Sequence, residues 1–69
     1  MMDALELARL AWQRAQADLQ TSLADLEKAV AALADPSHVQ LARDQVTDRQ
    51  RIADEYLNRY ITQLGKSRL

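Results

Sequence analysis

The tripeptide Asp35-Pro36-Ser37 lies almost midway along the 69-residue chain and decides its fold. Pro36 is the only proline, and a continuous helix cannot pass through it because it lacks a backbone N–H and its ring clashes with the preceding turn. Asp35, the residue before it, is disfavoured from the helical conformation. Helix-forming residues dominate on both sides. We therefore predict an all-α fold, an antiparallel two-helix hairpin with coiled-coil-like packing, built by a single domain of residues 1–69.

The first helix is expected over about residues 4–34. Asp3 and Glu6 have the spacing of a capping box, with Asp3 as the N-cap. Large apolar residues follow at intervals of seven: Leu5, Trp12, Leu19, Leu26 and Leu33. Small residues alternate with them at Ala8, Ala15, Ser22 and Ala29, and Leu23 and Val30 widen the stripe near the turn. This pattern predicts a seam at which a facing helix can approach closely.

The second helix is expected over about residues 36–64, with Asp35 as N-cap and Pro36 as its first residue. Gly65 is predicted to end this helix in the left-handed conformation, and Lys66 and Arg68 suit the negative end of its dipole. The first half is polar. The second half has a wide apolar face at helical spacing, formed by Ile52, Ala53, Tyr56, Leu57, Tyr60, Ile61 and Leu64.

Folding at Asp35 predicts which residues of the two helices meet. The numbers of facing residues should sum to about 70, which pairs Leu33 with Val39, Leu19 with Ile52, Trp12 with Leu57 and Leu5 with Leu64. The seam is then narrow and closed near the turn. At the other end, where the chain starts and finishes, two helices cannot cover all the apolar side chains, so some apolar surface is expected to stay exposed there.

Charge and composition exclude several classes of partner. The chain carries nine basic and ten acidic residues, a net charge of −1, and no cysteine. No basic stripe or basic helix face is present, so we expect neither nucleic acid nor a membrane as a partner. No apolar run approaches the ~20 residues that span a bilayer. The N-terminus has acidic residues where a secretory signal needs basic ones, which favours a cytoplasmic protein.

The residues that could carry chemistry do not form a site. His38 is the only histidine and adjoins Ser37, but near neighbours at a helix start cannot form a Ser-His-Asp relay with Asp35. Asp44 and Asp48 lie four residues apart, and nothing nearby completes a metal-ligand set. We predict no catalytic residue, no metal and no cofactor, and expect a protein that is not an enzyme.

The candidate site is instead a partner-binding surface at the open end. Leu7 and Leu10 lie three residues apart and outside the main seam, which favours contact with another protein. The only aromatic residues, Trp12, Tyr56 and Tyr60, gather at the same end. They either form the hairpin's own core or anchor a partner, since tryptophan and tyrosine are favoured interface anchors. The predicted partner-binding residues are Leu7, Leu10, Trp12, Tyr56, Tyr60 and Ile61.

The stretch from Leu19 to Gln40, LQTSLADLEKAVAALADPSHVQ, resembles the E-type co-chaperones of the type III secretion needle subunit. The similarity lies in the spacing of Leu19, Leu23 and Leu26, in Lys28, and in a turn that contains an aspartate. The resemblance implies a small helical protein that pairs with a tetratricopeptide-like chaperone. Together the pair would keep the needle subunit soluble in the bacterial cytoplasm before export.

Two functional hypotheses follow, both based on the small size of the fold. A hairpin of this length buries too little to be strongly stable alone, so burial against another chain is expected. In the first hypothesis the protein is a co-chaperone that stabilises a helical partner. In the second it is a homodimeric, antiparallel four-helix bundle with a structural or regulatory role, in which symmetry buries the same surface. A homo-oligomer in the absence of a partner is compatible with both.

Overall fold

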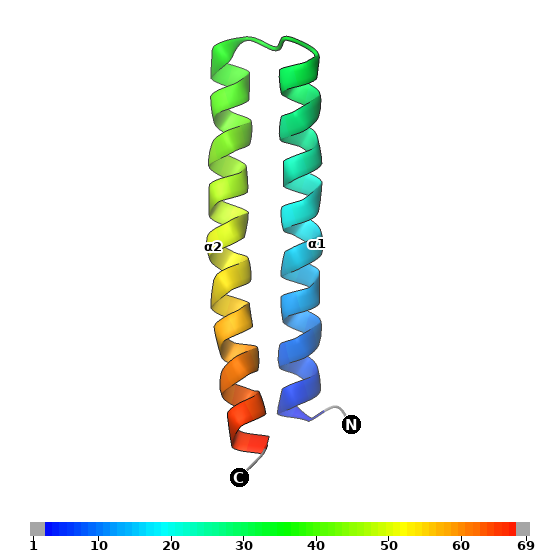
Figure 1. The fold of residues 1–69 in the computed structure, drawn as a ribbon, viewed down its shortest axis with the longest axis vertical. Coiled ribbons are helices and arrows are strands. Elements are labelled where there is room, and N and C mark those ends of the chain that lie inside the picture. Colours follow the sequence, from blue (N-terminus) through cyan, green and yellow to red (C-terminus); the bar gives the residue numbers. More distant parts are fainter. Residues whose placement is uncertain (1–2, 68–69) are drawn as a thin grey trace.

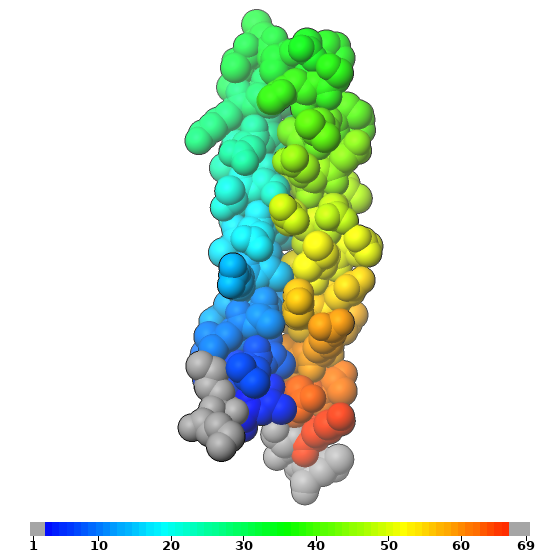
Figure 2. All heavy atoms as spheres, turned by 180° about the vertical axis from the view of Figure 1, so that it is seen from behind, coloured from blue at the N-terminus to red at the C-terminus, as the bar shows by residue number. Residues whose placement is uncertain are grey.

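The structure is a computed structural model that describes residues 3–67. Two helices, α1 (Ala4–Ala31) and α2 (Pro36–Ser67), run antiparallel and are joined by a loop of residues 32–35 (Figure 1). The start of α1 and the end of α2 lie together at the end opposite the loop, and the rod measures 52 × 18 × 13 Å. The side chains of α1 and α2 meet along the whole length of the rod (Figure 2). The predicted all-α hairpin is confirmed.

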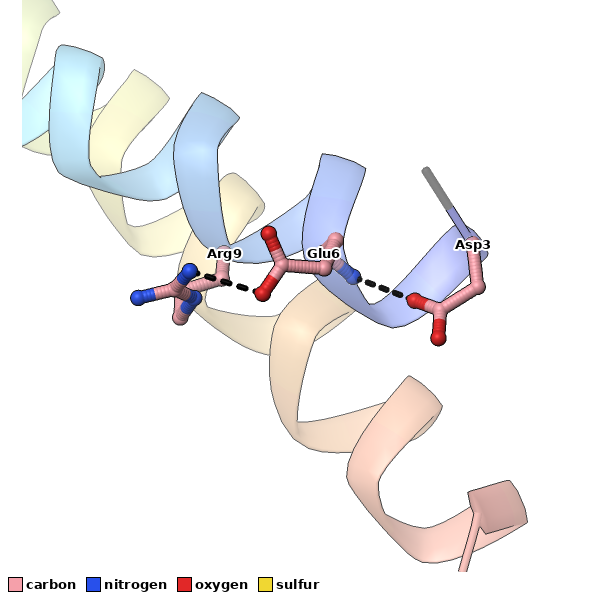
Figure 3. A network of polar contacts seen from close by, with 3 residues as sticks. All are labelled: Asp3, Glu6 and Arg9. Atoms are coloured by element: carbon pink, nitrogen blue, oxygen red, sulfur yellow. Dashed lines mark hydrogen bonds and ion pairs between the residues drawn. The ribbon is translucent and has the colours of Figure 1, made fainter. Parts of the chain in front are cut away.

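The N-terminus of α1 is capped as predicted. The Asp3 carboxylate accepts a hydrogen bond of 2.8 Å from the backbone N–H of Glu6 (Figure 3). The Glu6 carboxylate pairs with the Arg9 guanidinium at 2.8 Å, one turn further along the helix. Asp3 therefore satisfies one of the free N–H groups of the first turn, and Glu6 adds a surface ion pair.

α1 ends at Ala31, earlier than the predicted Leu33 or Ala34, because the chain closes the helix with a Schellman motif. The N–H of Leu33 donates to the Val30 carbonyl at 3.1 Å, and the N–H of Ala34 donates to the Ala29 carbonyl at 3.0 Å. These bonds require a left-handed residue between them. Leu33 takes that role, with φ of 54°, and is the only residue of the described range 3–67 with a positive φ in the left-handed region.

The left-handed geometry turns Leu33 out of the seam. Its side chain is 90% exposed, so the predicted contact between Leu33 and Val39 is wrong. The seam of α1 ends one heptad earlier, at Leu26 and the buried Ala29. The loop is therefore held by its backbone hydrogen bonds and not by packing of a large side chain.

Replacing Leu33 with glycine is expected to stabilise the hairpin by about 1 kcal/mol, because glycine adopts the left-handed conformation without the steric penalty of a β-carbon. Urea denaturation followed by circular dichroism measures the change. Leu33→Ala is the matched control: it removes the exposed side chain but keeps the β-carbon, and should bring no comparable gain. A glycine variant less stable than the alanine variant would contradict the Schellman assignment.

α2 begins as predicted, with Asp35 as its cap and Pro36 as its first residue. The Asp35 carboxylate accepts hydrogen bonds from the hydroxyl of Ser37 at 2.6 Å and from the N–H of His38 at 3.1 Å. The bond from Ser37 contributes most to lowering the pKa of Asp35 below its ordinary value, and the bond from the His38 N–H adds to it. The ionised form of Asp35 is therefore the form that holds the helix start.

The lowered pKa of Asp35 predicts a pH dependence of stability. The contribution of this cap is present above the ordinary pKa of an aspartate and is lost as the pH falls through the lower pKa of the folded state, because protonation weakens the bonds from Ser37 and His38. Asp35→Asn, which keeps a capping side chain but does not titrate, should lose less stability between about pH 4 and pH 2. Thermal unfolding of both proteins across this range tests the difference, and parallel curves would contradict it.

The end of α2 differs from the prediction. The helix runs through Gly65 to Ser67, and Gly65 does not have a positive φ, so it is not a left-handed cap. Gly65 is exposed, and a single glycine in an exposed last turn costs too little to stop a helix. Lys66 lies in the last turn, where its charge suits the helix dipole. Arg68, expected to act in the same way, lies outside the described residues.

The core is made mainly of small side chains. The buried residues in the described part of the chain are Ala15, Leu19, Ser22, Ala29, Ala42 and Ala53. Leu23, Val46, Ile52 and Tyr56 pack against the cluster of Ala15, Leu19 and Ala53. The predicted small positions Ala15, Ser22 and Ala29 are thus confirmed as buried positions of the seam, whereas Ala8 is half-buried. Within residues 3–67 no large side chain is completely buried.

Candidate partner-binding surface

The open end of the hairpin holds the six predicted partner-binding residues, and the structure divides them into two groups. Trp12, Tyr56 and Tyr60 are half-buried between the helices. Leu7, Leu10 and Ile61 are exposed. The three aromatic side chains therefore take part in the packing of α1 against α2. The three exposed aliphatic side chains contribute little to it.

Trp12 of α1 and Tyr60 of α2 stack on each other. Their ring centroids lie 5.8 Å apart and the ring planes are inclined by 19°. The predicted partner of Trp12 was Leu57, three residues earlier. Tyr60 follows Val46 and Ala53 at intervals of seven in the α2 seam, and Leu57 lies beside that seam. Tyr60 lies nearly one turn beyond Leu57, and the numbers of Trp12 and Tyr60 sum to 72 (12 + 60), close to the predicted sum of about 70.

Tyr56 is part of both the core and the surface. It packs against the central cluster, and the Arg59 guanidinium lies over its ring, 5.1 Å from the centroid. It also lines a shallow hollow of about 250 Å³ between the helices. The hollow is walled by Ala11, Ala15, Ile52 and Tyr56, with Arg14 and Asp18 beside them. This is an apolar depression with charged groups at its edge.

Leu7, Leu10 and Ile61 face away from the seam. Leu7 is 56% exposed, Leu10 38% and Ile61 55%. Leu7 and Leu10 lie nearly one turn apart on the outer surface of α1. Ile61 is the residue after Tyr60, so it points about 100° away from the aromatic stack. Leu7 and Leu10 lie roughly 140° and 200° around α1 from Trp12, so they are on the outer side of α1, whereas Ile61 lies beside Tyr60 on α2.

The turn end also exposes apolar side chains, two of which the sequence prediction placed in the seam. Val30 is 55% exposed and Leu33 90%. Val30 was expected to widen the seam and Leu33 to close it, so the prediction of a closed turn end is wrong. Leu41 is 57% exposed, as expected for a residue outside the heptad of Val39 and Val46. Apolar surface is thus left at both ends of the rod.

The polar residues singled out from the sequence form hydrogen bonds and ion pairs with near neighbours in the chain. His38 is exposed, and the hydroxyl of Ser37 donates to Asp35. Asp44 accepts a hydrogen bond from Gln40 and Asp48 pairs with Arg51 at 2.7 Å. Among residues 3–67, no three histidine, cysteine or acidic side chains lie close enough together to hold a metal ion.

Comparisons with known proteins identified no relative of this chain. No protein family matches the chain, and no curated protein or solved structure is significantly similar to it. Within the described range, neither helix has the length and apolar character needed to cross a membrane.

The stack of Trp12 on Tyr60 predicts an energetic coupling between the two residues. A double-mutant cycle with Trp12→Leu and Tyr60→Leu should give a coupling free energy of about 1 kcal/mol, because each variant removes the same aromatic pair. Urea unfolding of the four proteins measures it. A second cycle that pairs Trp12→Leu with Val39→Ala, near the turn, serves as control and should give a coupling close to zero. Equal couplings in both cycles would contradict the stack.

Proposed function

We propose that the protein is a non-enzymatic binding subunit that docks on a helical protein through the open end of its hairpin. The observation that carries this proposal is the exposure of Leu7, Leu10 and Ile61 at the end of the rod that also holds the Trp12–Tyr60 stack. Leu7 and Leu10 have the spacing with which one helix face anchors in the apolar groove of a helical partner. The half-buried aromatic rings add rigid apolar surface at the same end.

The accessible area of the chain supports a docking role. The isolated hairpin exposes 5377 Å². A compact monomer of 7.8 kDa is expected to expose about 4,400 Å². The excess of about 1,000 Å² is comparable to the ~800 Å² that each partner buries in an interface of standard size. The rod therefore has enough surplus surface for one ordinary protein–protein contact.

Contact with a partner would also stabilise the folded hairpin, because the core contains few large side chains. Alanines fill most of the buried positions, so the hairpin gains little from burying large side chains. A partner that binds only the folded hairpin stabilises it by mass action, by about 2.7 kcal/mol when the partner is present at 100 times its dissociation constant. Folding and binding of this subunit would then support each other.

The resemblance of residues 19–40 to the type III secretion co-chaperones supports a more specific form of the proposal. In this form the partner is a tetratricopeptide-like chaperone in the bacterial cytoplasm, and the pair keeps the needle subunit soluble before export. Stacked helical repeats present concave surfaces that suit a narrow helical rod. This assignment of partner and compartment rests on the resemblance, whereas the docking surface rests on the exposed residues.

Co-expression with the products of the neighbouring genes tests the proposal. One of these products should co-purify with the wild-type hairpin, and Leu10→Glu and Ile61→Glu should each weaken the complex by about 2 kcal/mol, roughly thirtyfold. Gln13→Glu is the matched control: it places the same charge at an exposed position of α1 and should bind normally. All three variants should keep the helicity of the wild type. Complexes of equal strength in all three would refute the proposed surface.

A further inference from the structure

Leu33 conflicts with the pattern of the helix that precedes it. It continues the heptad of Leu5, Trp12, Leu19 and Leu26, yet its side chain is 90% exposed. Its backbone has a φ of 54°, a conformation that is sterically unfavourable for a leucine. Closing the hairpin therefore removes an apolar side chain from the seam and strains the backbone that carries it.

The residues around Leu33 favour a helix over the turn that they form. Residues 31–34 read AALA, and alanine and leucine are the strongest helix formers. In the turn, the N–H of Leu33 donates to Val30 and the N–H of Ala34 donates to Ala29. If α1 continued to Ala34, Leu33 would donate to Ala29 and Ala34 to Val30. The two N–H groups would exchange acceptors, so straightening the turn costs neither of these hydrogen bonds.

Pro36 permits α1 to extend as far as Ala34. Its ring disfavours the helical conformation at the preceding residue, Asp35. Asp35 already has a non-helical role as the cap of α2, where it accepts hydrogen bonds from Ser37 and His38. A straightened chain would thus consist of α1 to Ala34, a break of one residue at Asp35, and α2 unchanged.

We infer that two copies of this chain open at residues 32–35 and exchange helices, so that α1 of each copy packs against α2 of the other. A short hinge loop under strain favours such an exchange. The seam contacts of the hairpin are kept, because they form between the same two helices. Facing residues keep a sum of about 72, which is the sum for the stacked Trp12 and Tyr60. Leu33 then lies level with Val39 of the second copy.

The exchange completes the seam at the turn end. Val39 is half-buried and lies one heptad before Val46 in the α2 seam. In the hairpin Leu33 is turned out of that seam. In the exchanged dimer each Leu33 continues the heptad of its own helix and meets Val39 of the other copy. A second copy is the expected occupant of this surface, because the surface continues the interface that α1 and α2 already form.

The gain at Leu33 sets the strength of the dimer. A short loop holds the two helices of the hairpin at an effective concentration in about the millimolar range, so exchange without any gain would need that concentration. Relief of the strained backbone and burial of the leucine occur in both copies. Together they are expected to lower the dissociation constant about a thousandfold, to the micromolar range.

Exchange of helices does not depend on the proposed function. The exchanged dimer has an open end at each extremity, formed by Leu7 and Leu10 of one copy and Ile61 of the other. A variant that abolishes the exchange should still bind the helical partner, and Leu10→Glu should still exchange. Failure of one proposal is thus distinguishable from failure of the other.

Sedimentation equilibrium and small-angle X-ray scattering of the full chain, from micromolar to millimolar concentration, test the inference. The wild type should form a dimer whose maximum dimension is about 100 Å, roughly twice the 52 Å length of the hairpin. A monomer at every concentration would overturn the inference. A dimer no longer than the hairpin would show association side by side and would overturn the exchange of helices.

Substitutions near the turn test the role of Leu33. Leu33→Gly fits the left-handed conformation and removes the side chain that the exchange buries, so it should raise the dissociation constant about a thousandfold. Leu41→Ala is the matched control: it removes an exposed leucine at the same end but outside the seam, and should dimerise as the wild type does. Equal dimerisation of Leu33→Gly and wild type, or equal weakening by both substitutions, would overturn the assigned hinge.

Pro36→Ala tests the same hinge in the opposite direction. It removes the ring that keeps Asp35 out of the helical conformation, so a helix can pass through the hinge and the exchanged dimer should become stronger, by about tenfold or more. The same sedimentation experiment measures the change. A Pro36→Ala dimer weaker than that of the wild type would contradict a straightened hinge.

Discussion

The close approach of two helices through small side chains is the constraint on which the rest of this structure depends. Ala15, Ser22 and Ala29 of α1 and Ala42 and Ala53 of α2 form the buried seam. Small residues let two helix backbones come close, and they lose little side-chain entropy when they are buried. They also bury little apolar area, so the stability that each contact contributes is small. The seam therefore fixes the geometry of the hairpin but contributes little to its free energy of folding.

The exposed apolar surface follows from that seam. Because alanines occupy most of the contact positions, the larger side chains lie beside the seam or outside it, and a rod of two helices has no third element to cover them. Exposed leucine, isoleucine and valine side chains are consequently found at both ends of the molecule. The shallow hollow lined by Ala11, Ala15 and Tyr56 lies beside two of these small side chains.

The sequence predicted the features that depend on local chemistry. Pro36 had to interrupt the helix, Asp3 and Asp35 had to cap, and the heptad of small residues had to face the other helix, because each follows from backbone sterics or helical period. The prediction at Leu33 failed because it continued the first helix to the turn with Leu33 in the seam, whereas the Schellman hydrogen bonds place Leu33 in the left-handed conformation. The prediction at Gly65 failed because it assumed that glycine ends the helix, whereas an exposed glycine continues α2.

The candidate site, like the fold, was predicted from the sequence only in part. The sequence was enough to predict exposed apolar surface at the open end, because that end carries more apolar side chains than two helices can cover. The stack of Trp12 on Tyr60 was not predicted, because the direction in which each ring leaves its helix cannot be derived from residue numbers alone. The exposure of Leu33 was missed because it depends on the direction of a single backbone torsion at that residue.

The apolar burial that the alanine seam does not provide would have to come from contact with another molecule. The open end presents exposed side chains on both helices, a shape that suits the concave surface of a larger helical protein. Burial of Leu7, Leu10 and Ile61 in such a contact would add apolar area to the fold without changing the packing of the small side chains in the seam.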